Sequence, residues 1–252
     1  MKNKTILVTG GASGIGAAIV RKFACEKSTV YFIDTNQEAA DQITEELNQT
    51  ENSVHFLAGD ISDFAAIKSL ISQIPGKLDV LINNAGISHI GNLEHTSEED
   101  FDKIFRVNVK GIFNCTQAAI GRLIADGGGS ILNMCSVAAT IGIPDRFAYS
   151  MSKGAVLSLS LSIARDYVDK NIRCNCISPG RVHTPFVDGF LAKNYPGKEK
   201  EMFEKLAATQ PLGRMGSPEE IAELAYFISS DSGGFITGAN YTIDGGFMGL
   251  KM

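Results

Sequence analysis

Short apolar runs alternate with longer amphipathic segments along the whole chain. The first run, at residues 5–9, is followed by a glycine-rich stretch and then by apolar residues at helical spacing over residues 17–24. This succession of strand, turn and helix recurs. It predicts seven strands, at residues 5–9, 29–34, 54–58, 79–82, 130–134, 172–177 and 238–243. It predicts helices at about 17–24, 37–49, 63–73, 98–125 and 149–170, and a charged, helix-rich segment at about 186–228.

The regular alternation of strands and helices indicates the fold class. Parallel strands need a crossover between them, and helices usually supply it on both faces of the sheet. The sequence therefore predicts an α/β fold: a single doubly wound domain with a seven-stranded parallel sheet and helices on both faces. Because we find no linker, repeat or shift in composition, we expect residues 1–252 to form one domain.

Bulk composition argues against several classes of protein. The 252 residues carry a net charge of −5 with no basic cluster, which argues against nucleic-acid binding. No apolar run reaches the roughly 18 residues of a membrane span, and no secretory signal is recognisable, so we expect a cytoplasmic protein. The five cysteines form no Cys-x-x-Cys pair and the four histidines are scattered, so neither a disulfide framework nor a metal site is expected.

A tyrosine and a lysine lie four residues apart where the second long helix is predicted to begin. On a helix, Tyr149 and Lys153 would share one face. An ammonium group near a phenol favours the ionised phenol, so the pair suits proton transfer to or from oxygen. Ser136 lies 13 residues upstream of the tyrosine, just after a predicted strand, and completes a candidate proton-transfer site.

The glycine-rich turn after the first strand is a candidate phosphate site. Gly10, Gly14 and Gly16 let the backbone approach a dinucleotide pyrophosphate, and the N-terminus of the following helix favours negative charge. Asp34 ends the second strand, 18 residues beyond Gly16, where a carboxylate can accept hydrogen bonds from the adenosine ribose. It would also repel a 2′-phosphate, and neither the turn nor residues 34–36 contain Arg or Lys. The sequence therefore predicts NAD(H) rather than NADP(H).

Over essentially its whole length, the chain resembles the single-domain short-chain dehydrogenases/reductases. The motifs that carry the resemblance are the glycine turn, Asp60-Ile61, Asn83-Asn-Ala-Gly86, Asn108, the Ser136/Tyr149/Lys153 set, the segment 179–184 and Asp244-Gly-Gly246. The resemblance implies a Rossmann domain that binds a nicotinamide cofactor. The cofactor contacts that it implies are Gly10, Ser13, Gly14, Ile15, Gly16, Asp34, Asp60, Ile61, Asn84, Ala85, Gly86, Tyr149, Lys153, Pro179, Gly180, Val182 and Thr184.

The same resemblance assigns catalytic roles to four residues. Tyr149 would be the general acid or base at the substrate oxygen. Lys153 would favour the ionised tyrosine and hold the nicotinamide ribose. Ser136 would orient the carbonyl or alcohol, and Asn108 would hold a water in a proton relay through the lysine.

Three arginines are candidate ligands of an acidic substrate. Arg146 lies three residues before Tyr149, in the loop that lines the substrate pocket in this family. Arg181 lies beside the nicotinamide segment, and Arg214 lies at the far side of a predicted lid at about 186–214. A guanidinium suits bidentate carboxylate binding. With Ser136 and Tyr149, these residues resemble the substrate sites of members that act on small hydroxy acids or sugar-derived acids.

The expected activity is the NAD(H)-dependent interconversion of a secondary alcohol and a ketone. The alternative is a 3-oxoacyl-carrier-protein reductase, although those enzymes generally use NADP(H). Steroid or polyol substrates, and a non-enzymatic NAD-sensing protein on the same fold, are further alternatives.

Two long predicted helices, at about 98–125 and 150–170, are apolar on more than one face. A helix with one face on the sheet and a second apolar face needs a partner. The family resemblance implies that these helices pair in a homotetramer. The expected partners are thus other copies of the chain and a small-molecule substrate, without nucleic acid or membrane.

Overall fold

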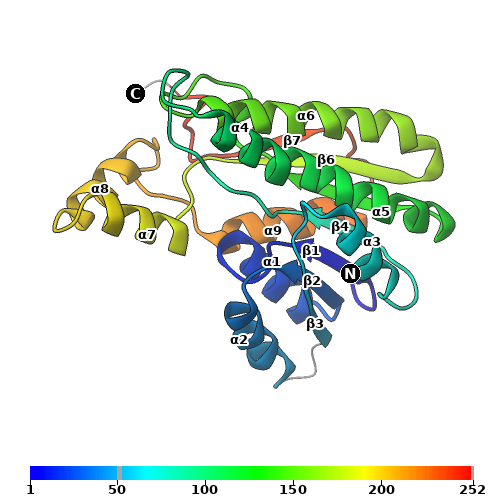
Figure 1. The fold of residues 1–252 in the computed structure, drawn as a ribbon. Coiled ribbons are helices and arrows are strands. Elements are labelled where there is room, and N and C mark those ends of the chain that lie inside the picture. Colours follow the sequence, from blue (N-terminus) through cyan, green and yellow to red (C-terminus); the bar gives the residue numbers. More distant parts are fainter. Residues whose placement is uncertain (50–52, 251–252) are drawn as a thin grey trace.

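The structure, a computed structural model, describes residues 1–49 and 53–250 and contains one seven-stranded sheet (Figure 1). The strand order is β3-β2-β1-β4-β5-β6-β7, and every pair of neighbouring strands is parallel. This confirms the predicted α/β fold and its parallel sheet. The strands are β1 (Thr5–Thr9), β2 (Thr29–Asp34), β3 (Ser53–Ala58), β4 (Val80–Asn83), β5 (Gly129–Met134), β6 (Ile172–Pro179) and β7 (Asn240–Ile243).

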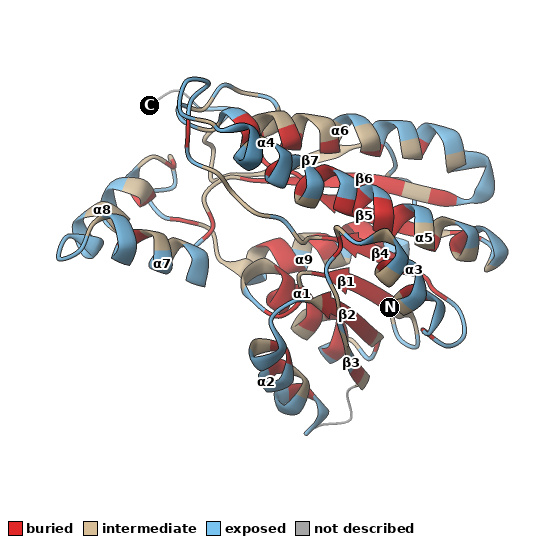
Figure 2. Cartoon of the chain, in the orientation of Figure 1, coloured by how far each residue is buried: buried red, intermediate tan, exposed pale blue. Residues whose placement is uncertain are grey.

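The central strands are buried on both faces, as their nearly continuous apolar sequences require (Figure 2). Successive side chains of a strand point to opposite faces of the sheet. In β1, Ile6 and Val8 therefore pack into one hydrophobic cluster, whereas Leu7 packs into the other. The sheet thus separates two cores, and each core is closed by its own layer of helices.

Helices cover both faces of the sheet, as predicted. The helices α1, α2 and α9 pack on one face, whereas α3, α5 and α6 pack on the other. The helices are α1 (Gly14–Cys25), α2 (Gln37–Asn48), α3 (Phe64–Ser72), α4 (Glu98–Phe105), α5 (Gly111–Ala125), α6 (Phe147–Tyr167), α7 (Pro185–Asn194), α8 (Glu199–Ala208) and α9 (Pro218–Ser229). Short 3-10 turns lie at Val137–Ala139, Val168–Lys170 and Asp231–Gly233.

The long helix predicted at about 98–125 has a wider turn in its middle. Between α4 and α5, the segment Arg106–Lys110 is a π-helix, closed by a hydrogen bond from the Gly111 amide to the Arg106 carbonyl. Such turns occur often at functional sites. This one carries Asn108, whose side chain is bonded to the chain after β4 rather than to its own helix.

The helices α7 and α8 project from the body of the molecule beyond the carboxyl ends of the strands (Figure 1). Figure 2 shows that most of their surface is exposed or only partly buried. They occupy the segment for which the sequence predicts a lid. Within residues 1–49 and 53–250, no helix is both long and apolar enough to cross a bilayer.

Candidate active site

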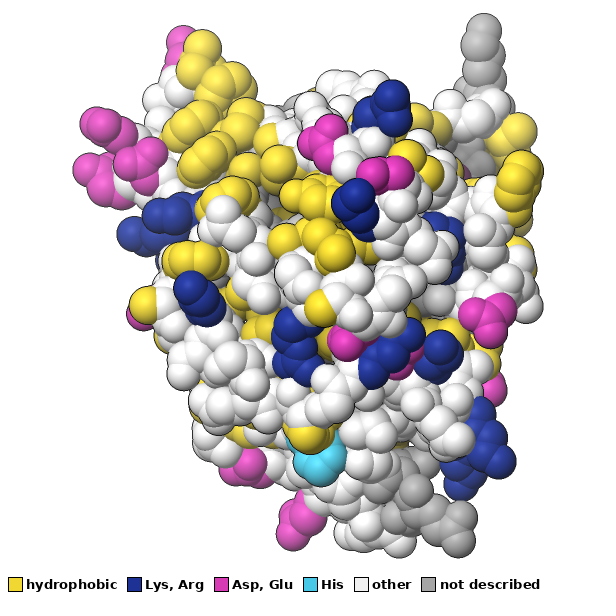
Figure 3. Space-filling model, turned by 90° about the vertical axis from the view of Figure 1, so that its right-hand side faces the viewer, with side chains coloured by type: hydrophobic (Ala, Val, Ile, Leu, Met, Phe, Trp, Pro, Cys, Tyr) yellow, Lys and Arg dark blue, Asp and Glu magenta, His cyan; other side chains and the backbone are white. Residues whose placement is uncertain are grey.

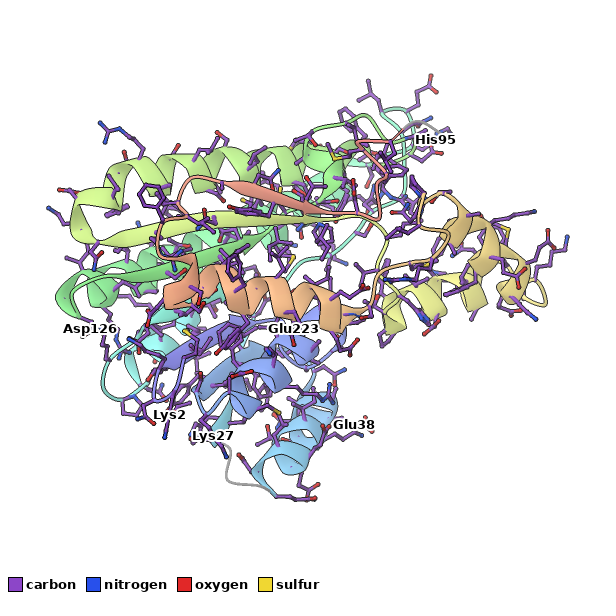
Figure 4. The ribbon with its side chains drawn as sticks, turned by 180° about the vertical axis from the view of Figure 1, so that it is seen from behind. Lys2, Lys27, Glu38, His95, Asp126 and Glu223 are labelled. Carbon is purple, nitrogen blue, oxygen red and sulfur yellow. The ribbon has the colours of Figure 1, made fainter. Side chains whose placement is uncertain are left out.

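A cavity of about 920 Å³ lies at the carboxyl ends of the strands, where β1 is flanked by β2 on one side and β4 on the other. Ligands bind at this point in open α/β sheets because the chain connections run to opposite sides there. In Figure 4, His95, in the loop after β4, lies toward this end of the molecule, and Asp126, before β5, lies at the opposite end. The cavity is of the size that small-molecule and cofactor sites have.

Most of the residues expected to bind cofactor or substrate line this one cavity. Gly16 and Asn108 are not in its wall but support it, and Arg214 lies elsewhere. The expected residues that line it are Gly10, Ser13, Gly14, Ile15, Asp34, Asp60, Ile61, Asn84, Ala85, Gly86, Ser136, Arg146, Tyr149, Lys153, Pro179, Gly180, Arg181, Val182 and Thr184.

The glycine turn is shaped by close packing against its neighbours. Gly10 has a φ of 67°, and a Cβ there would lie 2.8 Å from the Ala85 Cα atom. A Cβ on Gly16 would collide with the Gly10 carbonyl oxygen. The N-cap residue of α1, Ser13, makes no side-chain capping bond. Amides in the first turn are therefore left without a capping side chain beside the cavity, a suitable arrangement for a pyrophosphate.

Asp34 is held by the backbone on both of its carboxylate oxygens. The Ala12 amide donates to Oδ2 at 2.9 Å, and the Asn36 amide donates to Oδ1 at 3.0 Å. The first bond ties the end of β2 to the glycine turn. The carboxylate thus has a fixed orientation in the cavity wall, and each oxygen keeps lone pairs for a further donor.

Tyr149 and Lys153 lie in the first two turns of α6, facing the same cavity. The Lys153 ammonium, in a residue that is only 5% exposed, lies 5.7 Å from the centroid of the Tyr149 ring. Its Nζ donates to the Met134 carbonyl at 2.7 Å, which leaves two of its three N–H donors for other partners. Ser136 follows β5, and its Oγ accepts a bond from the Ala138 amide at 3.2 Å. Phenol, ammonium and hydroxyl thus line one cavity.

Asn108 supports this group from behind through a fully buried serine. Its amide group exchanges bonds with the Ile87 backbone, at 2.8 Å to the amide and 2.9 Å to the carbonyl. It also donates to Ser152 Oγ at 3.0 Å, and that hydroxyl donates to the Tyr149 carbonyl at 2.7 Å. The sequence offered no signal for Ser152, because its partner lies 44 residues away on another helix.

Arg146 and Arg181, two of the candidate substrate ligands, both line the cavity. Both are half-buried, and burial lowers the pKa of each. The charge of Arg146 lowers the pKa of Arg181 further, so the two guanidinium groups repel each other. Within residues 1–49 and 53–250, no carboxylate forms an ion pair with either group. The pair therefore brings two positive charges into the cavity that are not bound by a carboxylate of the described residues, although the charge of Asp145 acts on Arg146.

The backbone at Arg146 is clamped by the loop after β4. The Gly91 amide donates to the Asp145 carbonyl and the Phe147 amide donates to the Gly91 carbonyl, each at 3.0 Å. Asp145 itself has a φ of 55°, a left-handed conformation that non-glycine residues rarely adopt. The clamp therefore fixes the backbone path that leads into α6.

The expectation for Arg214 is wrong. Its guanidinium forms two hydrogen bonds with Glu220, at 2.7 and 2.8 Å, and it does not line the cavity. Glu220 also accepts a bond from the Ser217 amide and closes the capping box of α9. Arg214 therefore serves the N-terminus of α9 rather than a substrate.

His89 also lines the cavity and was not singled out in the sequence. Its Nε2 lies 3.5 Å from Asp100 Oδ2, and its Nδ1 is buried with no hydrogen-bond partner among the residues that the structure describes. Among the described residues, no cluster of three or more His, Cys, Asp or Glu side chains could hold a metal ion.

Comparison with known proteins shows the family to which this chain belongs. A family described as enoyl-(acyl carrier protein) reductase matches residues 10–248. The chain is 35% identical to 3-oxoacyl-[acyl-carrier-protein] reductase FabG of Thermotoga maritima, covering 98% of this chain and 99% of that one. It is 36% identical to 2-keto-3-deoxy-L-fuconate dehydrogenase of Xanthomonas campestris pv. campestris, covering 98% of this chain and 81% of that one.

A solved structure agrees with these matches. A variant of actinorhodin polyketide ketoreductase, crystallised with NADPH, superimposes with a TM-score of 0.93 at 25% identity, covering 99% of this chain and 100% of that one. The chain therefore belongs to the short-chain dehydrogenase/reductase family. Its fold and relatives define an oxidoreductase that acts on an alcohol or ketone with a nicotinamide cofactor.

Proposed function

We propose that this protein interconverts a secondary alcohol and a ketone with NAD(H), and that the substrate is a small hydroxy acid or a sugar-derived acid. The observation that carries the proposal is a single cavity with Asp34 in one part of its wall and Tyr149, Lys153 and the unpaired arginines in another. A bound nicotinamide would supply or accept the hydride. The remaining chemistry falls to the side chains of the cavity.

Tyr149 is the proposed general acid or base. It gives a proton to the carbonyl oxygen in reduction and takes it from the alcohol in oxidation. A positioned acid or base of this kind contributes about 10²–10⁴-fold to the rate. Ser136 orients the substrate oxygen toward the phenol. Lys153 favours the ionised phenol and holds the nicotinamide ribose with donors that the Met134 carbonyl does not use. Asn108 positions a water for the proton relay through the lysine.

The preference for NAD(H) rests on Asp34. Two backbone amides hold its oxygens, which keep lone pairs that would accept bonds from the ribose hydroxyls, and its charge would oppose a 2′-phosphate. The ketoreductase relative was crystallised with NADPH, so relatives with this fold include NADPH binders. In this chain, no Lys or Arg in residues 10–16 or 34–36 offsets the carboxylate.

The acidic substrate rests on Arg146 and Arg181. Two guanidinium groups that repel each other in a partly buried site are stabilised when an anion binds between them. The similarity to a dehydrogenase named for a keto-deoxy sugar acid agrees with this substrate class. A 3-oxoacyl-carrier-protein reductase is the second candidate because the FabG relative aligns along nearly its whole length. Asp34 argues against it, since those enzymes generally use NADP(H).

We further propose that residues 1–252 act as one domain in a cytoplasmic homotetramer, with residues 186–214 as its substrate lid. Residues 50–52 and 251–252 of this span lie outside the described residues. Apolar side chains on the long helices are exposed, among them Phe105 at 44%, Phe113 at 47% and Leu161 at 48%. Figure 3, which views the molecule from the right-hand side of Figure 1, shows hydrophobic side chains gathered in its upper left part. Light scattering that gave the mass of a monomer would refute the assembly.

The decisive experiment combines a substrate screen with two substitutions. NAD⁺ reduction is measured over hydroxy acids, sugar acids, sugars, polyols and a hydroxyacyl thioester. Tyr149→Phe should abolish turnover while NADH still binds, and Arg146→Ala should raise KM for the best acid. Substantial turnover by the phenylalanine variant would exclude the proposed mechanism. A thioester or neutral alcohol as the best substrate, with an unchanged KM after Arg146→Ala, would exclude the acidic substrate.

A further inference from the structure

The Arg181 side chain is anchored at its inner nitrogen by the residue that follows α8. Arg181 Nε donates to Thr209 Oγ1 at 2.9 Å. The Thr209 hydroxyl donates in turn to the Leu206 carbonyl at 2.7 Å and accepts from Gln210 Nε2 at 3.0 Å. A hydroxyl has one donor and two acceptor positions, so all of its hydrogen-bonding capacity is used. Its orientation is therefore fixed, and it fixes the guanidinium.

The anchor leaves the outer edge of the guanidinium without a partner. None of the hydrogen bonds within residues 1–49 and 53–250 uses Nη1 or Nη2 of Arg181. Arg146 uses Nη1 only for the carbonyl of the preceding residue, at 3.0 Å. Two outer edges that can each bind a carboxylate oxygen pair are therefore available in one cavity.

The bond to Thr209 opposes the repulsion between the two arginines. Without it, Arg181 could rotate away from Arg146 toward solvent, because an arginine side chain has many rotamers and hydrates readily when released. The bond also connects the cavity to the predicted lid, since Thr209 is the C-cap residue of α8. A change in the position of α8 would therefore move the group that holds Arg181.

We propose that Thr209 is a positioning residue for substrate recognition: it holds Arg181 by Nε so that both arginines bind one carboxylate, and it makes the lid helix α8 part of that anion site. The inference rests on the proposed acidic substrate. It adds that the affinity for a carboxylate depends on a lid hydroxyl that the carboxylate itself need not touch.

The test measures binding of malonate, a dicarboxylate without an oxidisable hydroxyl, to the complex with NADH by titration calorimetry. Thr209→Val should weaken malonate binding about tenfold, the size expected for loss of one hydrogen bond from a charged donor. Thr209→Ser keeps the hydroxyl and should restore the affinity. Thr44→Val is the matched control, because its hydroxyl also bonds to a carbonyl of its own helix but lies on α2, outside the cavity.

A double-mutant cycle separates positioning from a general structural effect. In an Arg181→Ala background, Thr209→Val should have no further effect on malonate affinity. The role of Thr209 would be overturned if Thr209→Val weakened malonate binding equally in the parent and in the Arg181→Ala background, or if it did not weaken binding in the parent. Thr209→Ser provides a second test in case Thr209→Val does not fold. If Thr209→Ser binds malonate no better than Thr209→Val, the role of Thr209 is also overturned.

The outcome also distinguishes this inference from the proposed function. If Arg146→Ala and Arg181→Ala weaken malonate binding but Thr209→Val does not, only the role of Thr209 fails. If the parent protein does not bind malonate, or if neither arginine matters, the acidic substrate fails and the role of Thr209 with it.

Discussion

Replacing Asp34 by alanine isolates the charge that we hold responsible for cofactor choice. At about 4 Å and an effective dielectric constant of about 20, a unit charge on a 2′-phosphate is opposed by roughly 4 kcal/mol. A hydrogen bond from a ribose hydroxyl to the carboxylate contributes about 1.5–3 kcal/mol to NAD(H) binding. The two effects add to about 5.5–7 kcal/mol, and since each 1.4 kcal/mol is a factor of ten, the ratio of kcat/KM for NADP(H) to that for NAD(H) should rise about 10⁴- to 10⁵-fold.

The assay measures initial rates with each cofactor at saturating substrate, with the melting temperature as a check on folding. Alanine also removes the acceptor of the Ala12 amide, so some stability will be lost with both cofactors alike. Asp63→Ala is the matched control, because Asp63 also accepts a backbone amide bond but does not line the cavity. A parent enzyme that prefers NADP(H), or a ratio unchanged by Asp34→Ala, would refute the reasoning.

Three further predictions concern the packing and charges around the site. Gly16→Ala places a methyl group on a carbonyl oxygen, so it should cost about 1–3 kcal/mol of stability and weaken NADH binding. Gly121→Ala is the control, because a Cβ there meets no described atom within 4 Å and should do neither. Equal melting temperatures and NADH affinities for the two variants would contradict this prediction. Ser152→Ala should lower kcat about tenfold at unchanged KM for the cofactor, because a buried amide loses its acceptor. Ser150→Ala removes a buried hydroxyl that has no hydrogen-bond partner in the described part of the chain, so it should lower kcat far less; equal losses would argue against a role for the Ser152–Asn108 bond. Glu220 has a pKa lowered to about 2 by its arginine partner, so its contribution to stability is complete above the ordinary value of about 4.5 and is lost as pH falls toward 2. Glu220→Gln should therefore lower the melting temperature at pH 7 but progressively less below pH 4.5, and a constant difference would refute the charge pairing.

The sheet could be predicted from the sequence because its signal is local. Each strand is a short apolar run. The strand ends where the run ends or at a turn residue such as Gly10. The wall of the cavity also followed from local motifs, because the carboxyl ends of parallel strands meet at one edge. Asp34, which ends β2, therefore lies near the glycine turn after β1, as its bond to Ala12 shows.

The arginines show where that reasoning fails. The sequence makes all three arginines candidate ligands of an acidic substrate. A guanidinium is available to a ligand, however, only when no carboxylate of the chain has already bound it. Arg214 is paired with Glu220, whereas Arg146 and Arg181 have no such partner in the described part of the chain. Contacts between distant segments, such as Ser152 with Asn108, likewise leave no periodic pattern in a sequence.

The backbone clamp on Arg146 has a consequence for how substrate range can change. Gly91 holds residues 145 and 147 through main-chain atoms, and the side chain at position 146 adds one further bond, from Arg146 Nη1 to the Asp145 carbonyl. The two main-chain bonds remain when the side chain at position 146 is replaced, so the backbone leading to Tyr149, one helical turn further on, keeps these two anchors. We therefore expect that position 146 can be varied, in a laboratory library or during divergence of gene copies, to sample new substrates with the main-chain anchors of α6 in place.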